Sequence, residues 1–441
     1  RLALVLGDVS DDVGVTDVQL KAADGSLHAA TLSGGEFRGL VPVTPGLNAI
    51  EILVSDAAGN TTTQATSAFY GQLTGAGAAH SGALVHDKVY VWGKNNEGQA
   101  GIGGVTSLGD SGHPAAPVEL TFSEPLVQLQ FSQNSSFALS SSGNVWAWGD
   151  NDSGQLGLGA DDPNTLDEAI RTSPEQVSGV SNVTSIARGY DHTLLLLTDG
   201  TVLAFGENGK GQLGTGGTED SDTPTAVPGL TDIVQLAAGS ASSYALDASG
   251  KLYAWGRNQY GNLANATSDT DAHDTPMEIT GLPPLVQLAC GRDHVLALDE
   301  TGKLWGWGLN SSNQVGQYDT AVWGSPLTTP VELPWNSDVV MVHAQANQSF
   351  IELRGGRILG WGQNVNGSLG VATDEDLPEP IEPVFALDRL LDVGVGALHG
   401  VAMRNDGAVF AWGWSSEGSL GGGEGTIDRW SYRVPILVIA P

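Results

Sequence analysis

Large hydrophobic residues alternate with small ones in a short stretch that occurs seven times along the chain. In each copy a large apolar residue is followed by Val, Ala or Gly, then by an aromatic residue and glycine, as in Trp146-Ala147-Trp148-Gly149. A period of two is typical of a β-strand. Large side chains on one face and small ones on the other suit a sheet that packs closely between two neighbours. We therefore expect each copy to supply one strand of a stacked β-sheet.

The copies follow one another at intervals of 50 to 57 residues. Each is followed by Asn-x-x-Gly-Gln-Leu-Gly or a close variant, and each is preceded by a further apolar strand pattern that opens with Gly-x-x-[His/Ser]. Repeats of this length with four short strands predict a β-propeller. One complete repeat is expected to contain strands at 234–238, 244–247, 252–255 and 276–279. The aromatic-Gly pairs that mark the seven copies are Trp92-Gly93, Trp148-Gly149, Phe205-Gly206, Trp255-Gly256, Trp307-Gly308, Trp361-Gly362 and Trp412-Gly413.

Glycine marks the turns inside the repeats. Pairs such as Asp199-Gly200 and Asp406-Gly407 lie between two strand patterns, where a tight hairpin needs a positive φ. The first Gly of the Asn-x-x-Gly-Gln-Leu-Gly loop is replaced once, by Asn313, the residue that best tolerates a left-handed backbone after glycine. The apolar segment 434–440 is expected to be the last outer strand of the seventh repeat. It is too short to span a membrane.

The first 68 residues follow a different pattern. Alternating strand segments are separated by Gly/Asx turns, for example at Gly34-Gly35 and Gly59-Asn60. This pattern predicts a small β-sandwich and resembles a bacterial immunoglobulin-like module, of the kind that serves as a spacer in surface or secreted proteins. The predicted organisation is thus an immunoglobulin-like sandwich at 1–68, whose start is truncated, followed by a propeller at 69–441.

The repeats resemble those of the regulator of chromosome condensation family, in which a strand ends in Trp-Gly, Asn-x-x-Gly-Gln-Leu-Gly follows and Gly-x-x-His opens a later strand. The resemblance covers more than four fifths of the chain and implies an all-β, seven-bladed propeller. It implies no single function, because relatives include a nucleotide-exchange factor on chromatin, a plant ultraviolet photoreceptor and an inhibitor of β-lactamases. The photoreceptor carries its light-absorbing tryptophans in a turn slot where this chain has none.

The charge balance narrows the classes of partner. Asp and Glu number 50 against 18 Lys and Arg, which gives a formal net charge of -32. A surface of this sign repels phosphate backbones, so we expect no nucleic acid binding. No transmembrane run is present in the sequence.

Two features suggest catalysis or metal binding. Gly109-Asp110-Ser111-Gly112-His113, taken together with His80, is similar to the catalytic residues of trypsin-like proteases. Because His80 belongs to the repeat pattern and lies too near Ser111 in sequence for that fold, we predict no enzyme activity. A His/Ser position recurs in every repeat, and we expect it to form a shared hydrogen bond from an inner strand to the backbone. It contains His80, Ser135, His192, Ser242, His294, Ser349 and His399.

Acidic insertions follow several repeats at the same point. Asp269, Asp271 and Asp274 provide the oxygen ligands that calcium prefers, and the alternative is a solvated acidic rim. Calcium is the only cofactor that the sequence suggests.

Departures from the repeat are where a partner site should lie, because residues that obey the pattern build the scaffold. The turns between the first two strands of each repeat hold two variable residues, and tryptophans outside the pattern add exposed aromatic candidates. The predicted partner-binding residues are Asn134, Tyr190, Asp191, Arg292, Asp293, Asn347, Trp414 and Trp430.

These observations predict a non-enzymatic, extracytoplasmic bacterial protein, secreted or on the cell surface, that binds a protein through one propeller face. Two alternatives are an inhibitor of a secreted enzyme and a carbohydrate-binding module that uses Trp414 and Trp430. A third, less favoured alternative is guanine-nucleotide exchange.

Overall fold

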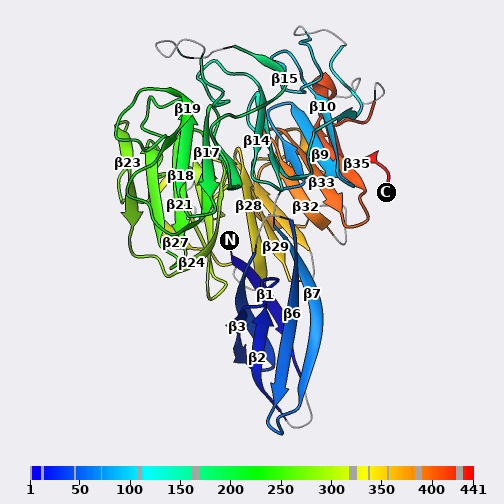
Figure 1. The fold of residues 1–441 in the computed structure, drawn as a ribbon, viewed down its shortest axis with the longest axis vertical. Helices are drawn as coiled ribbons and strands as arrows, with labels where there is room; N and C mark the ends of the chain where they lie inside the picture. Colours follow the sequence, from blue (N-terminus) through cyan, green and yellow to red (C-terminus); the bar gives the residue numbers. More distant parts are fainter. Residues whose placement is uncertain are drawn as a thin grey trace. The chain divides into compact units, whose positions relative to one another are not determined.

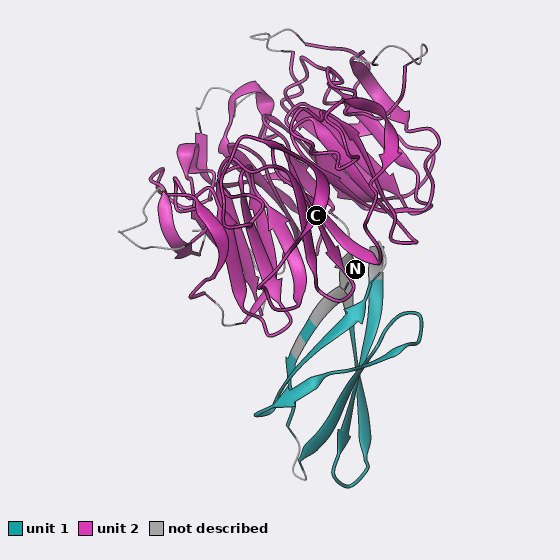
Figure 2. Ribbon diagram, turned by 90° about the vertical axis from the view of Figure 1, so that its left-hand side faces the viewer, with its two compact units in different colours: residues 1–71 teal, residues 72–441 magenta. Residues whose placement is uncertain are grey.

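The computed structural model divides the chain into two compact units, Arg1–Gly71 and Gln72–Pro441 (Figure 2). It describes residues 2–10, 14–43, 46–70, 72–106, 112–160, 166, 169–316, 325–335, 338–354, 357–382, 390–423 and 431–441. Within these residues the chain is all-β, with two short 3-10 turns, η1 (Val365–Gly367) and η2 (Ser416–Gly418). The described segments contain no helix of the length and apolarity needed to cross a membrane.

The first unit consists of two antiparallel sheets that share one core. One sheet has the order β1-β5-β4 and the other β3-β2-β6-β7. Val18, Leu20, Phe37, Val41 and Ile50 are buried between them. The strands are β1 (Leu2–Asp8), β2 (Val15–Lys21), β3 (Leu27–Ala29), β4 (Thr31–Ser33), β5 (Glu36–Pro42), β6 (Gly46–Asp56) and β7 (Thr61–Tyr70).

Seven four-stranded antiparallel sheets can be followed through the described residues of the second unit (Figure 1). Each is built from four consecutive strands, so no strand is exchanged between these sheets. We number them sheets 1 to 7 in chain order. Sheet 1 contains β8 (Thr74–Ala76), β9 (His80–Val85), β10 (Lys88–Gly93) and β11 (Val118–Leu120); sheet 2 contains β12 (Leu126–Phe131), β13 (Ser135–Ser140), β14 (Val145–Gly149) and β15 (Arg171–Gln176).

The other five sheets repeat this plan. Sheet 3 contains β16 (Val183–Arg188), β17 (His192–Leu197), β18 (Val202–Gly206) and β19 (Ser221–Ala226); sheet 4 contains β20 (Ile233–Ala238), β21 (Ser242–Asp247), β22 (Leu252–Arg257) and β23 (Ala272–Ile279). Sheet 5 contains β24 (Leu285–Cys290), β25 (His294–Asp299), β26 (Leu304–Gly308) and β27 (Leu327–Glu332). Sheet 6 contains β28 (Val339–Gln345), β29 (Gln348–Leu353), β30 (Ile358–Gly362) and β31 (Leu377–Ile381); sheet 7 contains β32 (Leu390–Val395), β33 (His399–Arg404), β34 (Val409–Trp414) and β35 (Ser431–Ile439).

The strands expected from the sequence in one repeat are confirmed as β20 to β23. The expected last strand is likewise confirmed as β35, which pairs with β34. The left-handed turns are also as expected, with φ of 81° at Gly200, 87° at Gly407 and 57° at Asn313.

The repeated tryptophans form the core between sheets. Trp148, Trp255 and Trp307 are fully buried, and burial of one such side chain contributes about 4–6 kcal/mol before entropy is subtracted. Each indole N–H also donates to a loop carbonyl of the preceding sheet, as from Trp148 to the carbonyl of Gln99 at 3.0 Å. These tryptophans are therefore scaffold residues.

The Asn-x-x-Gly-Gln-Leu-Gly loop of each sheet packs closely against the next sheet. Its Asn side chain accepts a hydrogen bond inside the loop, as from Leu213 N–H to Asn208 Oδ1 at 2.9 Å. A Cβ on Gly211 would lie 2.5 Å from the backbone of Asp274 in the next sheet, and one on Gly214 would lie 2.7 Å from the Trp255 indole. Only glycine permits approaches this close.

Side-chain amides cover the free edge of several innermost strands. Gln128 on β12 donates to the carbonyl of Ile186 at 3.0 Å and accepts from its N–H at 3.0 Å, so it pairs with the next sheet as a strand would. Gln235 makes the same pair of bonds with Leu288.

Between sheet 7 and sheet 1 this role falls to a carboxylate. Asp392 Oδ2 accepts from the N–H groups of Leu73 and Thr74, each at 2.7 Å, and from the Thr74 hydroxyl at 3.0 Å. Burial raises the pKa of Asp392 to about 6. The ends of the repeated region are thus joined directly.

Candidate functional site

The variable residues gather at one end of the sheets, which we call the turn face. It consists of the turns between the first and second strands and of the residue that follows each Trp-Gly or Phe-Gly pair. The two parts are joined by one repeated bond, in which the residue after glycine donates its N–H to the last turn residue, as from Glu207 to Asp191 at 2.7 Å. The residues after glycine are Lys94, Asp150, Glu207, Arg257, Leu309, Gln363 and Trp414.

Neighbouring turns are also bonded to one another. The N–H of Tyr190 donates to the carbonyl of Ser240 at 3.3 Å, Ser240 donates to Arg292 at 2.8 Å, and Arg292 donates to Ala346 at 2.6 Å. Backbone bonds of this kind hold the variable side chains in fixed positions across sheets 3 to 6.

A group of basic and aromatic residues lies on the turn face of sheets 3 to 5. We call Arg188, Tyr190, Arg257 and Arg292 the arginine cluster. The guanidinium of Arg292 lies 5.9 Å from the centre of the Tyr190 ring, which is the geometry of a cation-π contact. Asp293 forms ion pairs with two of the arginines: its Oδ1 lies 2.5 Å from Arg257 Nη2 and its Oδ2 lies 3.2 Å from Arg292 Nε.

Acidic residues occupy the adjoining part of the face. Burial, and then the charges of Glu207, Asp150 and Asp152, raises the pKa of Asp191 to about 6. Burial also raises the pKa values of Glu207 and Asp150. The turn face therefore carries a basic part and an acidic part, and Tyr190 and Asp191 mark the border between them.

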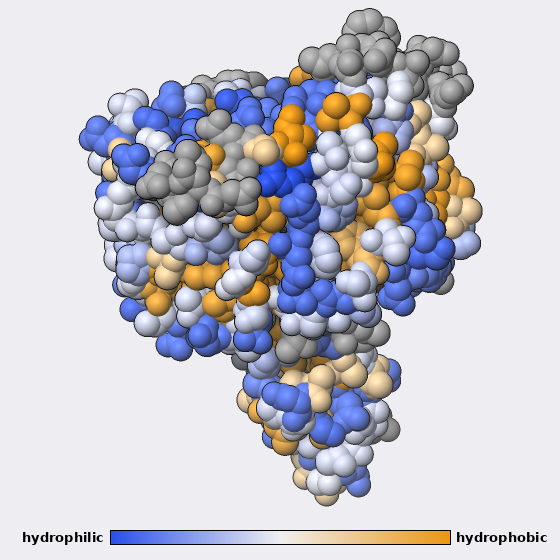
Figure 3. Space-filling view, turned by 45° about the horizontal axis from the view of Figure 1, so that its top comes forward, coloured by the Kyte–Doolittle hydropathy of each residue, from blue (hydrophilic) through white to orange (hydrophobic). Residues whose placement is uncertain are grey.

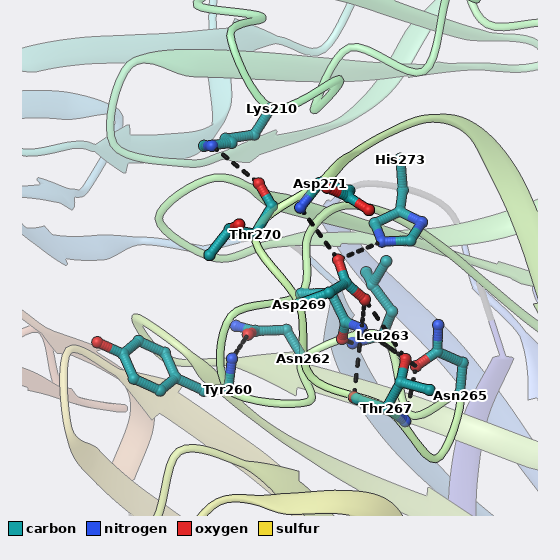
Figure 4. A network of polar contacts seen from close by, with 11 residues as sticks. Lys210, Tyr260, Asn262, Leu263, Asn265, Thr267, Asp269, Thr270, Asp271 and His273 are labelled. Carbon is teal, nitrogen blue, oxygen red and sulfur yellow. Dashed lines mark hydrogen bonds and ion pairs between the residues drawn. The ribbon is translucent and has the colours of Figure 1, made fainter.

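The predicted calcium ligands do not converge. Asp269 accepts hydrogen bonds from Asn258 at 2.9 Å, from His273 at 2.9 Å and from the N–H of Asp271 at 3.2 Å (Figure 4). Within the residues described, no three His, Cys, Asp or Glu side chains are placed to hold one metal ion. Asp269 closes its own loop through these bonds, and calcium binding there stays a prediction.

Other insertions use a polar side chain in the same way. Asp220 accepts from the N–H of Asn208 at 2.7 Å, Asp376 accepts from Asn364 at 2.9 Å, and His113 Nδ1 accepts from Asn95 at 3.1 Å. The protease-like segment 109–111 next to His113 lies outside the described residues.

The repeated histidines bond through Nε2 to a hydroxyl of the neighbouring sheet, whereas the serine at the same position in sheet 2 makes the expected bond to backbone, from the Ser135 hydroxyl to the carbonyl of Asp150 at 2.8 Å. His80 Nε2 lies 3.0 Å from Ser136 Oγ, and His294 Nε2 lies 2.8 Å from Ser349 Oγ. The serine in turn donates to a loop carbonyl, as from Ser136 to Gln99 at 2.8 Å, so the histidine acts as donor through Nε2. Burial lowers the pKa of His294 to about 3, which keeps the ring neutral.

The position assigned to Ser349 is wrong by one residue. Gln348 pairs with Gly362 as His294 pairs with Gly308, so Gln348 takes the histidine position in sheet 6. The turn there is formed by Ala346 and Asn347. In this sheet Gln345 replaces the glycine of the Gly-x-x-[His/Ser] motif. Without that glycine, the sequence points to Ser349 as the last residue of the motif, which places the repeat position one residue too late.

The predicted partner residues occupy different depths of the turn face. Arg292 is half exposed, whereas Asp293 is buried and holds arginines in place. Asn134 accepts from Gln99 at 3.4 Å, and Asn347 accepts from Gln314 at 3.3 Å. Trp414 is partly exposed on the same face. Trp430 lies outside the described residues.

Two members of the arginine cluster were not predicted. Arg188 is the last residue of β16 and Arg257 directly follows the glycine of β22. The signal that could have found Arg257 is its place in the variable slot after Trp-Gly. At the position of Arg188, the end of the first strand, the equivalent residues in the pairing of other sheets are small or apolar, such as Ala238 and Cys290.

Apolar and polar residues are interspersed on the visible surface (Figure 3). Among the exposed large apolar residues, Val434 and Leu437 share the outer strand β35.

Comparison with known proteins gives a consistent family. The RCC1-like domain model matches residues 186–439, and models of the regulator of chromosome condensation (RCC1) repeat match residues 142–196 and 127–155. The chain is 30% identical over 361 residues to the ultraviolet-B receptor UVR8 of Arabidopsis thaliana, which covers 80% of this chain and 79% of that protein. It is 29% identical to the E3 ubiquitin-protein ligase HERC2 of Homo sapiens over 80% of this chain, but over only 7% of the ligase.

Solved structures show the same fold. Human WBSCR16 superposes with a TM-score of 0.65 at 22% identity, covering 77% of this chain and 89% of that one. Yeast RCC1 (Prp20), solved with Kap60, superposes with a TM-score of 0.63 at 23% identity, covering 76% of this chain and 80% of that one. The resemblance expected from the repeats is confirmed: the chain belongs to the RCC1-like family of β-propeller repeat proteins.

Proposed function

We propose that this protein is a non-enzymatic binding protein whose second unit is a seven-bladed β-propeller and whose turn face binds a protein partner. The observation that carries the proposal is the separation of roles within the repeat. Residues that obey the pattern, such as Trp148, are buried between sheets, whereas Tyr190, Arg292 and Trp414 vary from sheet to sheet and meet on one face. The relative yeast RCC1 was solved bound to Kap60, which supports protein binding by this fold.

The proposal extends to the first unit and to location. Two antiparallel sheets around one core fit an immunoglobulin-like spacer, which we propose for residues 1–68. Such a spacer, with the net charge of -32, favours an extracytoplasmic bacterial protein that is secreted or attached to the cell surface. Detection of the protein in the envelope or secreted fraction by immunoblot tests the location, and its confinement to the cytoplasm would contradict it.

A pull-down with the full chain tests the turn face. The bait is compared with a variant carrying Tyr190→Ala, Arg292→Ala and Trp414→Ala, using envelope and secreted fractions of the source organism. Asp199→Ala and Asp406→Ala, in hairpins at the other end of the sheets, provide a matched control. A protein captured by the chain and the control but not by the face variant supports the proposal. Equal capture by all three baits would move the site elsewhere.

A partly exposed tryptophan favours carbohydrate binding as the second candidate. Trp414 follows the glycine of β34, and an aromatic ring at the surface can stack on a sugar. Glycan-array binding that disappears in Trp414→Ala would favour this reading. The related idea, inhibition of a secreted enzyme, predicts that the captured protein loses activity when the chain is added.

A further inference from the structure

The arginine cluster contains a cation without a counter-ion. The Arg188 guanidinium makes no hydrogen bond or ion pair with any described residue, in contrast to that of Arg357, which pairs with Glu382 at 2.7 Å. Burial lowers the pKa of the Arg188 guanidinium to about 10, so it remains charged at neutral pH although it is poorly solvated. A partly desolvated guanidinium gains most from a ligand that accepts its paired N–H donors.

The other two arginines share one carboxylate. Asp293 is buried, and the Oδ1 that contacts Arg257 also accepts from the Ser240 hydroxyl at 3.0 Å. Asp293 alone cannot balance two guanidinium groups. The Nε of Arg257 is also buried and has no partner among the described residues.

Tyr190 interacts electrostatically with all three arginines. The charges of Arg292, Arg188 and Arg257 each lower its pKa and that of Asp293 raises it, while burial has the largest effect and raises the pKa above its ordinary value. The hydroxyl therefore stays protonated. It has no hydrogen-bond partner among the described residues, so it is available as a donor beside the guanidinium groups.

The acidic part of the face interacts with Arg257 but not with Arg188. The pKa of Asp191, the next residue in the chain, responds to Glu207, Asp150 and Asp152 and to none of the arginines. Glu207 does interact with Arg257, whose charge lowers its pKa. Arg188 is left with no acidic neighbour among the residues described.

We propose that the arginine cluster of Arg188, Tyr190, Arg257 and Arg292 binds a carboxylate presented by the protein partner. The guanidinium of Arg188 offers the two parallel donors that suit a carboxylate, and the Tyr190 hydroxyl offers a third. The net charge of -32 disfavours a polyanion such as nucleic acid, whereas a single carboxylate brings little added repulsion. The carboxylate belongs to an acidic side chain or to a chain terminus. This inference rests on the proposed function and names the chemistry of its partner.

Fluorescence anisotropy with labelled peptides and the full chain tests the site. The probes are a Gly-rich peptide with Asp and Glu and an amidated C-terminus, its Asn/Gln counterpart, and a neutral peptide with a free C-terminal carboxylate. We expect binding of the first or the third and none of the Asn/Gln peptide. The first and third probes distinguish a side chain from a chain terminus.

Substitution at Arg188 provides the decisive comparison. Arg188→Gln should weaken binding roughly ten- to a hundredfold, because a charge-assisted hydrogen bond is lost, and Arg188→Lys should recover part of it. Lys303→Gln, in an exposed pair with Glu332 on the opposite hairpin, should bind as the parent does. Equal melting temperatures establish that the variants fold.

Two outcomes would overturn the inference: equal binding of the Asn/Gln peptide, or unchanged affinity in Arg188→Gln. Its failure is distinguishable from failure of the proposed function. If the pull-down partner is lost in the face variant but retained by Arg188→Gln, the face binds a protein without this carboxylate. If acidic peptides bind through Arg188 while the face variant captures the same proteins as the parent, the carboxylate site stands and the proposed partner face does not.

Discussion

The identity of several single residues in this protein is explained by contacts between neighbouring sheets. A Cβ on Gly291 would lie 2.1 Å from the ring of His294, so the glycine of Gly-x-x-His makes room for the imidazole. That ring is then held by a serine of the next sheet and stays neutral. Replacement of either residue affects the same junction, which explains why the two types occur together.

The buried histidine predicts a loss of stability in acid. The pKa of His294 is about 3 in the fold and ordinarily 6.5, so below pH 6.5 the unfolded chain takes up a proton that the folded chain does not. Stability is therefore complete above pH 6.5 and falls as the pH drops toward 3, by up to about 1.4 kcal/mol per pH unit for each such histidine. In His294→Gln, which copies sheet 6, we expect a shallower decline. Urea midpoints from pH 7.5 to 4.5 measure it.

An exposed histidine serves as the control. His86→Asn should leave the slope of stability against pH unchanged, since His86 is exposed. Parallel slopes for the parent and His294→Gln would mean that this histidine does not contribute to acid sensitivity.

At the scale of the element, the outer strands protect their free edges with proline. In sheet 3, Ala204 lies two residues before the glycine of the Phe-Gly pair and is paired with Thr225 of the outer strand, and Pro224 directly precedes Thr225. A proline stands at the equivalent position in every sheet. Proline has no N–H to offer another strand, and it tolerates the bulge found there in six of the sheets. The seven prolines are Pro117, Pro174, Pro224, Pro276, Pro330, Pro380 and Pro435.

Strand β35 has the proline, Pro435, but an exposed apolar residue where another outer strand has a charged one. Glu332 faces solvent in sheet 5 and pairs with Lys303 at 2.9 Å, whereas the equivalent position in sheet 7 holds Leu437, which is 52% exposed. We predict that Leu437→Glu reduces self-association at high concentration without changing the melting temperature by more than a few degrees. Glu332→Leu should have the opposite effect. Light scattering measures both, and no difference between them would show that this edge is already protected.

The repeats made the sheets predictable, and the site was less so. The aromatic-Gly pairs and the Gly turns fixed strands such as β20 to β23, because a period of two and a positive φ are visible in sequence. The register of sheet 6 was missed because Gln345 replaces the glycine that marks it. The arginine cluster joins residues 188, 257 and 292 from three sheets, and their approach depends on how the sheets pack.

At the scale of the whole molecule, the contact between sheets 7 and 1 closes the repeated region. Asp392→Ala removes the acceptor of two backbone N–H groups, and we expect it to lower the free energy of unfolding by about 1–3 kcal/mol. Asp392→Asn keeps an acceptor and should cost less. Urea denaturation followed by tryptophan fluorescence measures the effect, with Asp406→Ala as the control. An Asp392→Ala midpoint equal to that of the control would mean that closure does not depend on this residue.

The histidine–serine bonds between sheets alternate, so that they join every second pair of neighbouring sheets. They run from sheets 1, 3, 5 and 7 to sheets 2, 4, 6 and 1, for example from His192 to Ser243 and from His399 to Ser81. A two-step alternation cannot close evenly on an odd number, so sheet 1 alone both gives and receives such a bond. The mismatch falls where the first and last repeats meet, and it distinguishes that junction from all the others. A ring engineered to an even number of sheets, six or eight, could alternate throughout. Adding two sheets to the seven would leave an odd number and would keep one junction of this kind.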